Sequence, residues 1–440
     1  MAIKNRIEID CSMIMQPKVI EEKYLEIVSQ LNAKINSKEA LGQKYLGFFE
    51  IGKNIQSDDI QNIKKIVNFL ESESIEVFVI VAPKYICLQS EAIINFVYGK
   101  FNHKTKLKLL YVDENINGQE MAQLCQYLET KRFAINVISK TGDNIESLLI
   151  FRELVLMLIE QLGPKNANQY IFVTTNNNYG QLFQTVQTKK YNHLVLLDNT
   201  PEKFLNFSAA VLLPLACAKI DWEAYLDGAK EANEFYSTMP LNKNNSAYFY
   251  AVARLALKKA QWKYENIVVN SNSHCDLSRL FAMYLNATSY RKNRGLIVRN
   301  SVYPSDAKIN SHFFSEKEGK IIETQILLKN SLIDYSIAFH NNFEDDEFSY
   351  LVKQTYNQIG NTLNKVVSDN HFTYEVPNIK IYIQDTEAKT LGWLVTFIHR
   401  AAIMSAYLME IDPFEDDGLR TYNIELSKKF TELMGGKKND

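Results

Sequence analysis

Cysteine is scarce in this sequence, and its few residues form no recognisable pattern. Five cysteines occur among 440 residues, and none belongs to a C-x-x-C pair. An odd number of scattered thiols argues against a disulfide framework and against a zinc site. We therefore expect no metal site, and a reducing cytoplasm as the location. The positions are Cys11, Cys87, Cys125, Cys217 and Cys275.

A strong net charge and long apolar runs are missing as well. The 49 basic and 51 acidic residues leave a net charge of -2, which argues against bulk electrostatic binding to nucleic acid or a membrane surface. Apolar runs such as residues 207–218 fall short of the roughly 20 residues that cross a bilayer. The first residues, "MAIKNRIEIDCSM", show no secretory signal. We expect a soluble protein with no nucleic-acid partner and no membrane span.

The sequence does contain enough apolar material for a large core. Hydrophobic residues make up 46% and aromatic residues 12% of the chain, and this length usually folds as two domains or one large body. Short apolar runs alternate with longer helical periods, which is typical of parallel α/β units. Five strands are predicted in the first half, at residues 75–83, 106–112, 133–139, 169–175 and 193–198.

A second set of strands predicts a second domain of the same class. The strands are expected at residues 265–271, 293–301, 320–329 and 377–385, flanked by helices such as 390–411. We predict an α/β protein with two doubly wound domains, mainly parallel sheets and flanking helices. The predicted organisation is an N-terminal helical segment (1–45), a first domain (46–235), a second domain (236–410), and a C-terminal helix with a mobile tail (411–440).

One turn has the form of a phosphate-binding site. Residues 137–152, "VISKTGDNIESLLIFR", predict a strand, a polar turn and a helix N-terminus. The first amides of a helix attract an anion, and Ser139, Lys140 and Thr141 offer further donors. Asp143 competes with a phosphate for those amides, however, and both Asp143 and Asn144 are good N-cap residues. We favour the interpretation in which the turn caps itself.

Several segments resemble the glucose-6-phosphate isomerase family. Residues 136–158, around "SKTGDNIE", are similar to its sugar-phosphate-binding signature. Residues 45–51 ("YLGFFEI"), 211–232 ("VLLPLACAKIDWEAYLDGAKEA") and 376–423 (from "VPN" to "DPFEDDGLRTYN") resemble other family segments, in family order. The resemblance spans nearly the whole chain. It implies two phosphosugar-isomerase (SIS-type) domains, usually in a homodimer.

The resemblance also implies a reaction whose central groups are replaced here. The family interconverts an aldose and a ketose phosphate through a cis-enediol, with a carboxylate base, a ring-opening histidine and no metal or cofactor. The position of the base falls on Ala287, which cannot abstract a proton. The position of the histidine falls on Asn310 or Lys308. His312 is near but offset, and we interpret it as a surface or turn residue.

Other ligand-binding positions of the family differ as well. The C-terminal lysine falls on Asn423, and the arginine of its G-G-R loop falls on Lys203, which keeps the charge but loses the planar fork. The glutamine falls on Asp416 or Asp417. We interpret the nearby Lys428 and Lys429 as solvated residues. The family's glycine-rich loop falls on residues 81–88, "VAPKYICL", which have no glycine.

In that loop, Pro83 removes an amide donor and Lys84 is expected to be a solvated lysine. In the phosphate turn, Asn144 replaces the last threonine of the family signature. The positions that match are Ser139, Lys140, Thr141 and Glu146.

Three functions follow from this pattern. The leading hypothesis is a family member that has lost catalysis and serves a structural or protein-interaction role, for example as a subunit of a larger assembly. The second is a sugar-phosphate sensor that binds through Ser139, Lys140, Thr141 and Asn144 without turnover. The third is a divergent, active isomerase that uses displaced groups such as His312, Lys203 or Lys428. The expected partner is a second copy of the chain or another protein.

Overall fold

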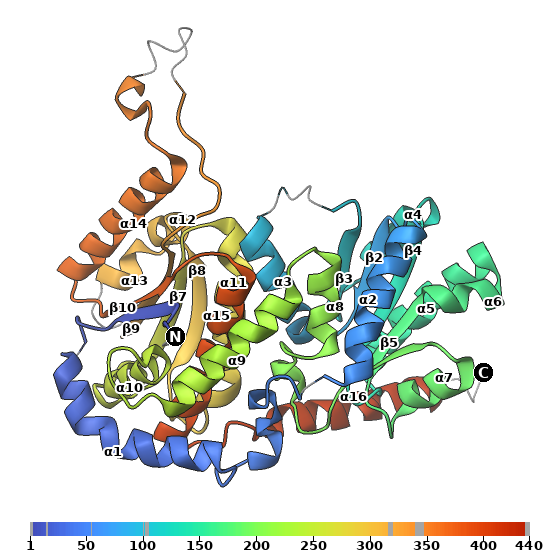
Figure 1. Cartoon of the computed structure of the whole chain (residues 1–440), viewed down its shortest axis with the longest axis horizontal. Helices are drawn as coiled ribbons and strands as arrows, with labels where there is room; N and C mark the ends of the chain where they lie inside the picture. Colours follow the sequence, from blue (N-terminus) through green and yellow to red (C-terminus); the bar gives the residue numbers. More distant parts are fainter. Residues whose placement is uncertain are drawn as a thin grey trace.

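Two five-stranded sheets organise the chain, and helices cover them (Figure 1). The computed structural model describes residues 3–14, 16–53, 55–99, 101, 105–315, 320–338 and 347–435. Both sheets are mainly parallel and doubly wound, which confirms the predicted fold class.

The first sheet has the strand order β3-β2-β4-β5-β6, and all neighbouring strands are parallel. The order reverses between β2 and β4, and doubly wound sheets bind ligands beyond the carboxyl ends of the strands at such a point. The strands are β2 (Val77–Val81), β3 (Lys108–Val112), β4 (Phe133–Ile138), β5 (Ile171–Thr175) and β6 (Asn192–Val195).

The second sheet has the order β1-β10-β9-β7-β8, in which β7 to β10 are parallel and β1 is antiparallel to β10. Its order reverses between β7 and β9, in the same way as in the first sheet. The strands are β1 (Ile7–Asp10), β7 (Tyr264–Val269), β8 (Ile297–Val302), β9 (Ile321–Leu328) and β10 (Asn378–Ile383).

The segment at residues 1–45, predicted as helical, contains a strand as well as a helix. This part of the chain begins with β1, which joins the second sheet, and continues with α1 (Pro17–Asn36). The strand is hard to predict because it has four residues and lies at the sheet edge, where only Ile7 is fully buried. The other strands of both sheets lie close to their predicted positions.

Helices enclose each sheet. Those between Ser57 and Cys217 are α2 (Ser57–Ser72), α3 (Lys84–Tyr98), α4 (Gly118–Glu129), α5 (Ile145–Leu162), α6 (Pro164–Ala167), α7 (Gln181–Lys189) and α8 (Ala209–Cys217). Those that follow are α9 (Trp222–Thr238), α10 (Ser246–Lys259), α11 (Cys275–Ser289), α12 (Ser305–Ile309), α13 (Ser311–Ser315), α14 (Tyr356–Thr373), α15 (Ala388–Leu408) and α16 (Asp417–Gly435).

The helix α15 forms the centre of the molecule. Its length and apolarity would suit a membrane span, but its side chains are almost all buried inside the protein, as in a core helix. It packs along α9 at very short range, because Gly228 and Gly392 allow the two backbones to approach.

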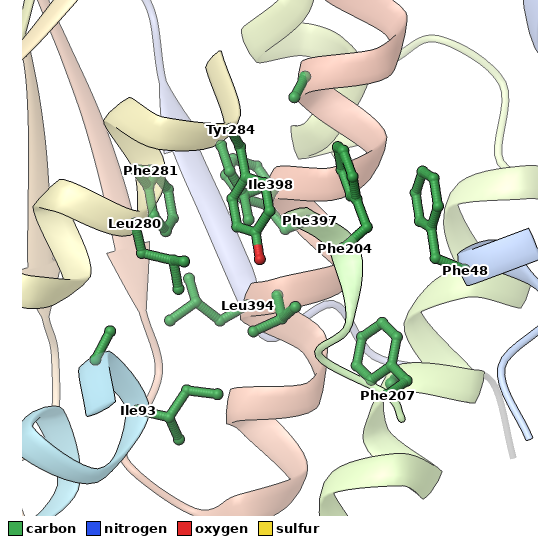
Figure 2. Packing of buried hydrophobic residues seen from close by; sticks show 14 of the residues in the cluster. Phe48, Ile93, Phe204, Phe207, Leu280, Phe281, Tyr284, Leu394, Phe397 and Ile398 are labelled. Atoms are coloured by element: carbon green, nitrogen blue, oxygen red, sulfur yellow. The ribbon is translucent and has the colours of Figure 1, made fainter. Parts of the chain in front are cut away.

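Aromatic side chains link α15 to both domains (Figure 2). Phe48 and Phe204 stack with their centroids 4.3 Å apart. Phe204 also contacts Tyr284 of α11, and Phe281 of α11 contacts Phe397 of α15. One hydrophobic core therefore continues from the first domain into the second, which holds the facing loops in a fixed geometry.

Candidate functional site

A cleft of about 770 Å³ lies where the two domains meet. The first domain contributes the segment after β2, the β4–α5 turn and the loop after β6, so the cleft opens at the switch point of its sheet. The second domain contributes the end of α11, and the segment before α16 closes another side. The lining includes Tyr45, Tyr85, Lys140, Thr141, Glu202, Lys203, Ala287, Arg291, Phe414 and Asp416.

Ala287 lines this cleft from the last turns of α11. The position that the resemblance assigns to the catalytic base therefore faces the cavity with a methyl group, which has no proton to exchange. Three carboxylates do line the cleft: Asp198, Glu202 and Asp416. Each is bound to a group of the chain itself, as described below.

The β4–α5 turn supplies side-chain acceptors for two of the backbone amides in the turn and the first turn of α5. Asn144 is the N-cap of α5 and accepts a hydrogen bond from the amide of Ser147 at 2.9 Å, so the predicted capping is confirmed for this residue. The Oγ of Ser139 accepts from the amide of Gly142 at 3.1 Å. Asp143 is exposed. Phosphate binding at Ser139, Lys140, Thr141 and Asn144 stays a prediction.

Lys140 holds a neighbouring loop instead of presenting its ammonium to the cavity. Its Nζ donates to the carbonyl oxygens of Asp198 and Thr200, at 2.8 and 2.9 Å. Burial lowers the pKa of Lys140 below its ordinary value. Its amide donates to Oε1 of Glu202 at 2.9 Å. Both of its donor groups are thus directed at the loop after β6. The carboxylate of Asp198 accepts from the hydroxyl of Tyr179 at 2.9 Å.

Glu202 is the important residue that the sequence analysis did not identify. It begins the short 3-10 helix η3 (Glu202–Phe204), and its Oε2 accepts from the hydroxyl of Tyr85 at 2.7 Å. Burial and the carboxylate of Glu202 raise the pKa of Tyr85. The only signal in the sequence is an acid directly before Lys203, and nothing there indicates a contact with a turn 62 residues earlier.

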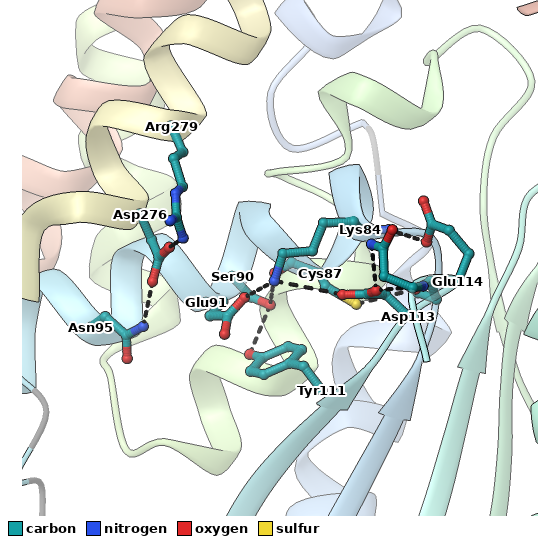
Figure 3. Close-up of polar contacts among 12 residues, drawn as sticks. Lys84, Cys87, Ser90, Glu91, Asn95, Tyr111, Asp113, Glu114, Asp276 and Arg279 are labelled. Carbon is teal, nitrogen blue, oxygen red and sulfur yellow. Dashed lines mark hydrogen bonds and ion pairs between the residues drawn. The ribbon is translucent and has the colours of Figure 1, made fainter. Parts of the chain in front are cut away.

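The N-terminus of α3, where the family has its glycine-rich loop, also carries internal partners (Figure 3). Pro83 is the N-cap, and the amide of Lys84 donates to Oε2 of Glu114 at 2.7 Å. The Nζ of Lys84 lies 2.9 Å from Glu91 and 3.7 Å from Asp113. Lys84 is therefore the first residue of α3 and not a loop lysine, and it pairs with carboxylates from α3 and from the segment after β3 while its side chain remains 39% exposed.

Lys203, which the resemblance assigns to the arginine position, binds Asp416, one of the two residues that it assigns to the glutamine. Their Nζ and Oδ2 atoms are 2.6 Å apart. Burial opposes ionisation of Asp416, but the hydrogen bond and charge of Lys203 outweigh it and lower the pKa of Asp416. The pair joins the loop after β6 to the start of α16.

Arg291 is also fully engaged with the chain. Its guanidinium donates to the carbonyl oxygens of Ala287 and Tyr290, both at 2.7 Å, and through Nε to that of Glu415 at 2.8 Å. Arg291 therefore fastens the segment before α16 to the end of α11.

The remaining predicted positions lie outside the cleft lining. His312 and Lys308 are exposed, on α13 and α12, and Asn310 lies half-buried between those helices. Asn423 is exposed on α16, on which Lys428 pairs with Glu425 at 2.6 Å. In the part of the chain that the structure describes, no group of three or more His, Cys, Asp or Glu residues is placed to hold a metal ion.

Comparisons with known proteins show which family the chain resembles over most of its length. A glucose-6-phosphate isomerase of Mycoplasmopsis pulmonis is 34% identical over 419 residues, which cover 94% of this chain and 97% of that protein. A glucose-6-phosphate isomerase of Mycoplasma mobile is 31% identical over 411 residues, or 92% and 94% of the two chains. No family model matches the sequence.

Solved structures show the same fold. A hypothetical protein of Thermus thermophilus gives a TM-score of 0.85 at 17% identity, covering 96% of this chain and 99% of that one. A glucose-6-phosphate isomerase of Chlamydia trachomatis gives 0.77 at 11% identity, covering 98% and 89%. The fold is that of a protein with two phosphosugar-isomerase domains. The chain belongs to the glucose-6-phosphate isomerase family.

Proposed function

We propose that this family member has lost isomerase catalysis and serves a structural or protein-interaction role in a larger assembly. The observation that carries this proposal is Ala287, which lines the cleft at the position assigned to the base. Moving a proton between two carbons requires a positioned acid–base group, and losing that group alone costs about 10²- to 10⁴-fold in rate.

The state of the other groups in the cleft supports the same function. Three cations of the cleft are bound to oxygen atoms of the chain: the ammonium groups of Lys140 and Lys203 and the guanidinium of Arg291. Catalytic groups that act as a unit leave little activity when several are changed together. We infer that the fold has been retained without the chemistry.

A coupled assay with fructose 6-phosphate tests the proposal. Wild-type protein is expected to show no turnover above the buffer rate. The variant Ala287→Glu is expected to remain inactive as well, because a base alone does not restore ring opening or ligand contacts. Turnover by the wild type well above the buffer rate would overturn the proposal.

An active isomerase is the second candidate, and the names of the relatives favour it more directly than they favour loss of catalysis. Among the described residues that line the cleft, the carboxylates that could serve as its base are Asp198, Glu202 and Asp416. In that case, one of the variants Asp198→Asn, Glu202→Gln and Asp416→Asn should lose about 10²-fold or more in kcat while the protein stays folded.

We further propose that the assembly contains a homodimer formed in the cytoplasm. The segments that flank residues 339–346 project from the body next to α14 (Figure 1). Five large apolar residues there are 58–80% exposed: Leu332, Ile333, Tyr335, Phe348 and Tyr350. Exposed apolar groups in this number are unusual for a monomer and suit a protein interface.

Sedimentation velocity tests this interface. The wild type should sediment with twice the chain mass, and the variant Ile333→Asp/Tyr350→Asp should dissociate. Leu41→Asp, which places a charge at another exposed apolar position, should leave the dimer intact. A wild-type monomer would rule out this part of the proposal.

A further inference from the structure

Glu202 is held in the cleft by contacts from two other elements. Its Oε1 accepts from the amide of Lys140 at 2.9 Å, and its Oε2 accepts from the hydroxyl of Tyr85 at 2.7 Å. Nε2 of Gln89, on α3, donates to the carbonyl oxygen of Glu202 at 2.7 Å. The carboxylate is therefore fixed in position by both its side chain and its backbone.

The carboxylate occupies the place where the turn would bind an anion. The amide of Lys140 lies in the turn between β4, which ends at Ile138, and the N-terminus of α5, and anions are favoured near such a helix end. Two other amides of the turn and the first helical turn, those of Gly142 and Ser147, already have side-chain acceptors. A phosphate ester that used the Lys140 amide would have to displace Glu202 or lie against its charge.

The nearby cations offer little compensation. Lys203 is paired with Asp416, and Arg291 is directed at carbonyl oxygens. The ammonium of Lys44 lies over the ring of Tyr45, 4.8 Å from its centroid, and Lys44 is exposed. Among the described cations that line the cleft, Lys44 thus contacts an aromatic ring, while three carboxylates line the same cleft.

We propose that Glu202 acts as a built-in anion that excludes phosphorylated ligands, so that the cleft accepts only ligands without a phosphate group. This inference rests on the proposed function, since an isomerase of this family must bind a sugar phosphate. Glu202 is then a specificity-determining residue, and its removal should restore binding that the wild type lacks.

Two variants separate the charge of Glu202 from its occupancy of the turn. Glu202→Ala removes the acceptor and frees both the amide of Lys140 and the hydroxyl of Tyr85. Glu202→Gln removes the charge but keeps an oxygen that can accept from the amide. The matched control is Glu120→Ala, because Glu120 is also a carboxylate at a helix N-terminus, that of α4, and lies outside the cleft.

Isothermal titration of the full chain with glucose 6-phosphate, and with glucose as the unphosphorylated control, tests the inference. Glu202→Ala should bind glucose 6-phosphate at least about tenfold more tightly than the wild type, with Glu202→Gln in between. Glu120→Ala should behave like the wild type, and the response to glucose should not differ among the four proteins.

Equal affinity of the wild type and folded Glu202→Ala for glucose 6-phosphate would overturn the inference. If Glu202→Ala does not fold, an unchanged affinity of Glu202→Gln overturns it instead. An isomerase assay on the same samples keeps the two proposals apart. Turnover by the wild type contradicts the proposed function, whereas an inactive wild type that binds glucose 6-phosphate as tightly as Glu202→Ala contradicts only the role of Glu202.

Discussion

His399 lies on α15 among four aromatic rings. Its ring centroid is 4.7 Å from that of Tyr284 and 5.0 Å from that of Phe204, with Phe48 and Phe207 slightly further away. Neither ring nitrogen has a hydrogen-bond partner among the described residues. Burial lowers the pKa of His399 to about 3, so the side chain is neutral in the folded protein.

This environment makes the stability of the protein depend on pH. In the unfolded chain His399 takes up a proton as the pH falls below about 6.5, whereas in the folded chain it stays neutral until about pH 3. The contribution of neutral His399 is therefore complete above pH 6.5 and decreases below it. The free energy of unfolding should fall by about 2 kcal/mol between pH 6.5 and pH 5 through this residue.

The variant His399→Phe isolates the effect. Its stability at pH 7 should lie within about 1 kcal/mol of the wild type, because an apolar ring of similar shape replaces an unpaired polar one. Urea denaturation at several pH values should show that the free energy of unfolding falls less steeply toward pH 5 in the variant than in the wild type. Parallel curves for the two proteins would contradict the assignment to His399, since other residues contribute equally to both.

Some residues of the site were predictable from their positions, but Asn310 and Asn423, which were assigned in the same way, lie outside the cleft lining, and the contacts within the site were not predictable. Ala287, Lys203, Lys140 and Thr141 do line one cleft, as the family resemblance implies. The sequence suggested Asp143 as the competing acid, but the carboxylate on the Lys140 amide is that of Glu202. Such a contact depends on how the loop after β6 folds back, which local patterns do not encode.

At the level of elements, the contact between α9 and α15 depends on two glycines. A Cβ atom added to Gly392 would lie 2.0 Å from the carbonyl oxygen of Tyr225, and one added to Gly228 would lie 2.0 Å from that of Lys389. These oxygens belong to helix backbone and cannot move without shifting the helices. The two glycines permit the close approach of α9 and α15 that buries the centre of α15.

Gly392→Ala should therefore destabilise the protein by about 1–3 kcal/mol, because overpacking forces the two backbones apart. The matched control is Gly360→Ala on α14, where a Cβ would have no neighbour within 4 Å. Alanine has a higher helix propensity than glycine, so this variant should leave the stability of the protein unchanged or raise it by up to about 1 kcal/mol. Thermal unfolding of both variants checks the prediction, and equal effects would contradict it.

Strands with a strong apolar pattern were predictable from the sequence, whereas the edge strand β1 was not. β2 and β4 consist of residues buried along the entire strand, so β2 appears as a continuous apolar run and β4 as one that only Asn136 interrupts. β1 has four residues, and pairing with β10 places only one of its side chains in full burial. Its assignment depends on a partner more than 360 residues away in the chain, which no local period reveals.

At the level of the whole molecule, the C-terminal part of the chain joins the two domains. The segment before α16 is fastened to α11 by Arg291, and the start of α16 is paired with Lys203 of the first domain. Further along the helix, the hydroxyl of Tyr422 donates to Glu146 of α5 at 3.3 Å. Most described side chains of α16 are exposed, so these few polar contacts hold the helix in place.

Arg291→Ala should loosen this connection. The variant leaves the carbonyl oxygens of Glu415 and Ala287 without their donor, and we expect a loss of about 1–3 kcal/mol in the free energy of unfolding. Amide hydrogen exchange in α16 should become faster, while exchange in β2 and β4 should change much less, because those strands are covered on both faces.

Arg279→Ala is the control for this prediction. Arg279 forms an exposed ion pair with Asp276 at 3.0 Å on the same helix that leads to Arg291, and exposed pairs of this kind contribute less than about 1 kcal/mol. If exchange in α16 is the same in the wild type and in Arg291→Ala, then Arg291 does not control this helix. The closure of the cleft would then depend on the Lys203–Asp416 pair, and Lys203→Ala would be the variant that releases α16.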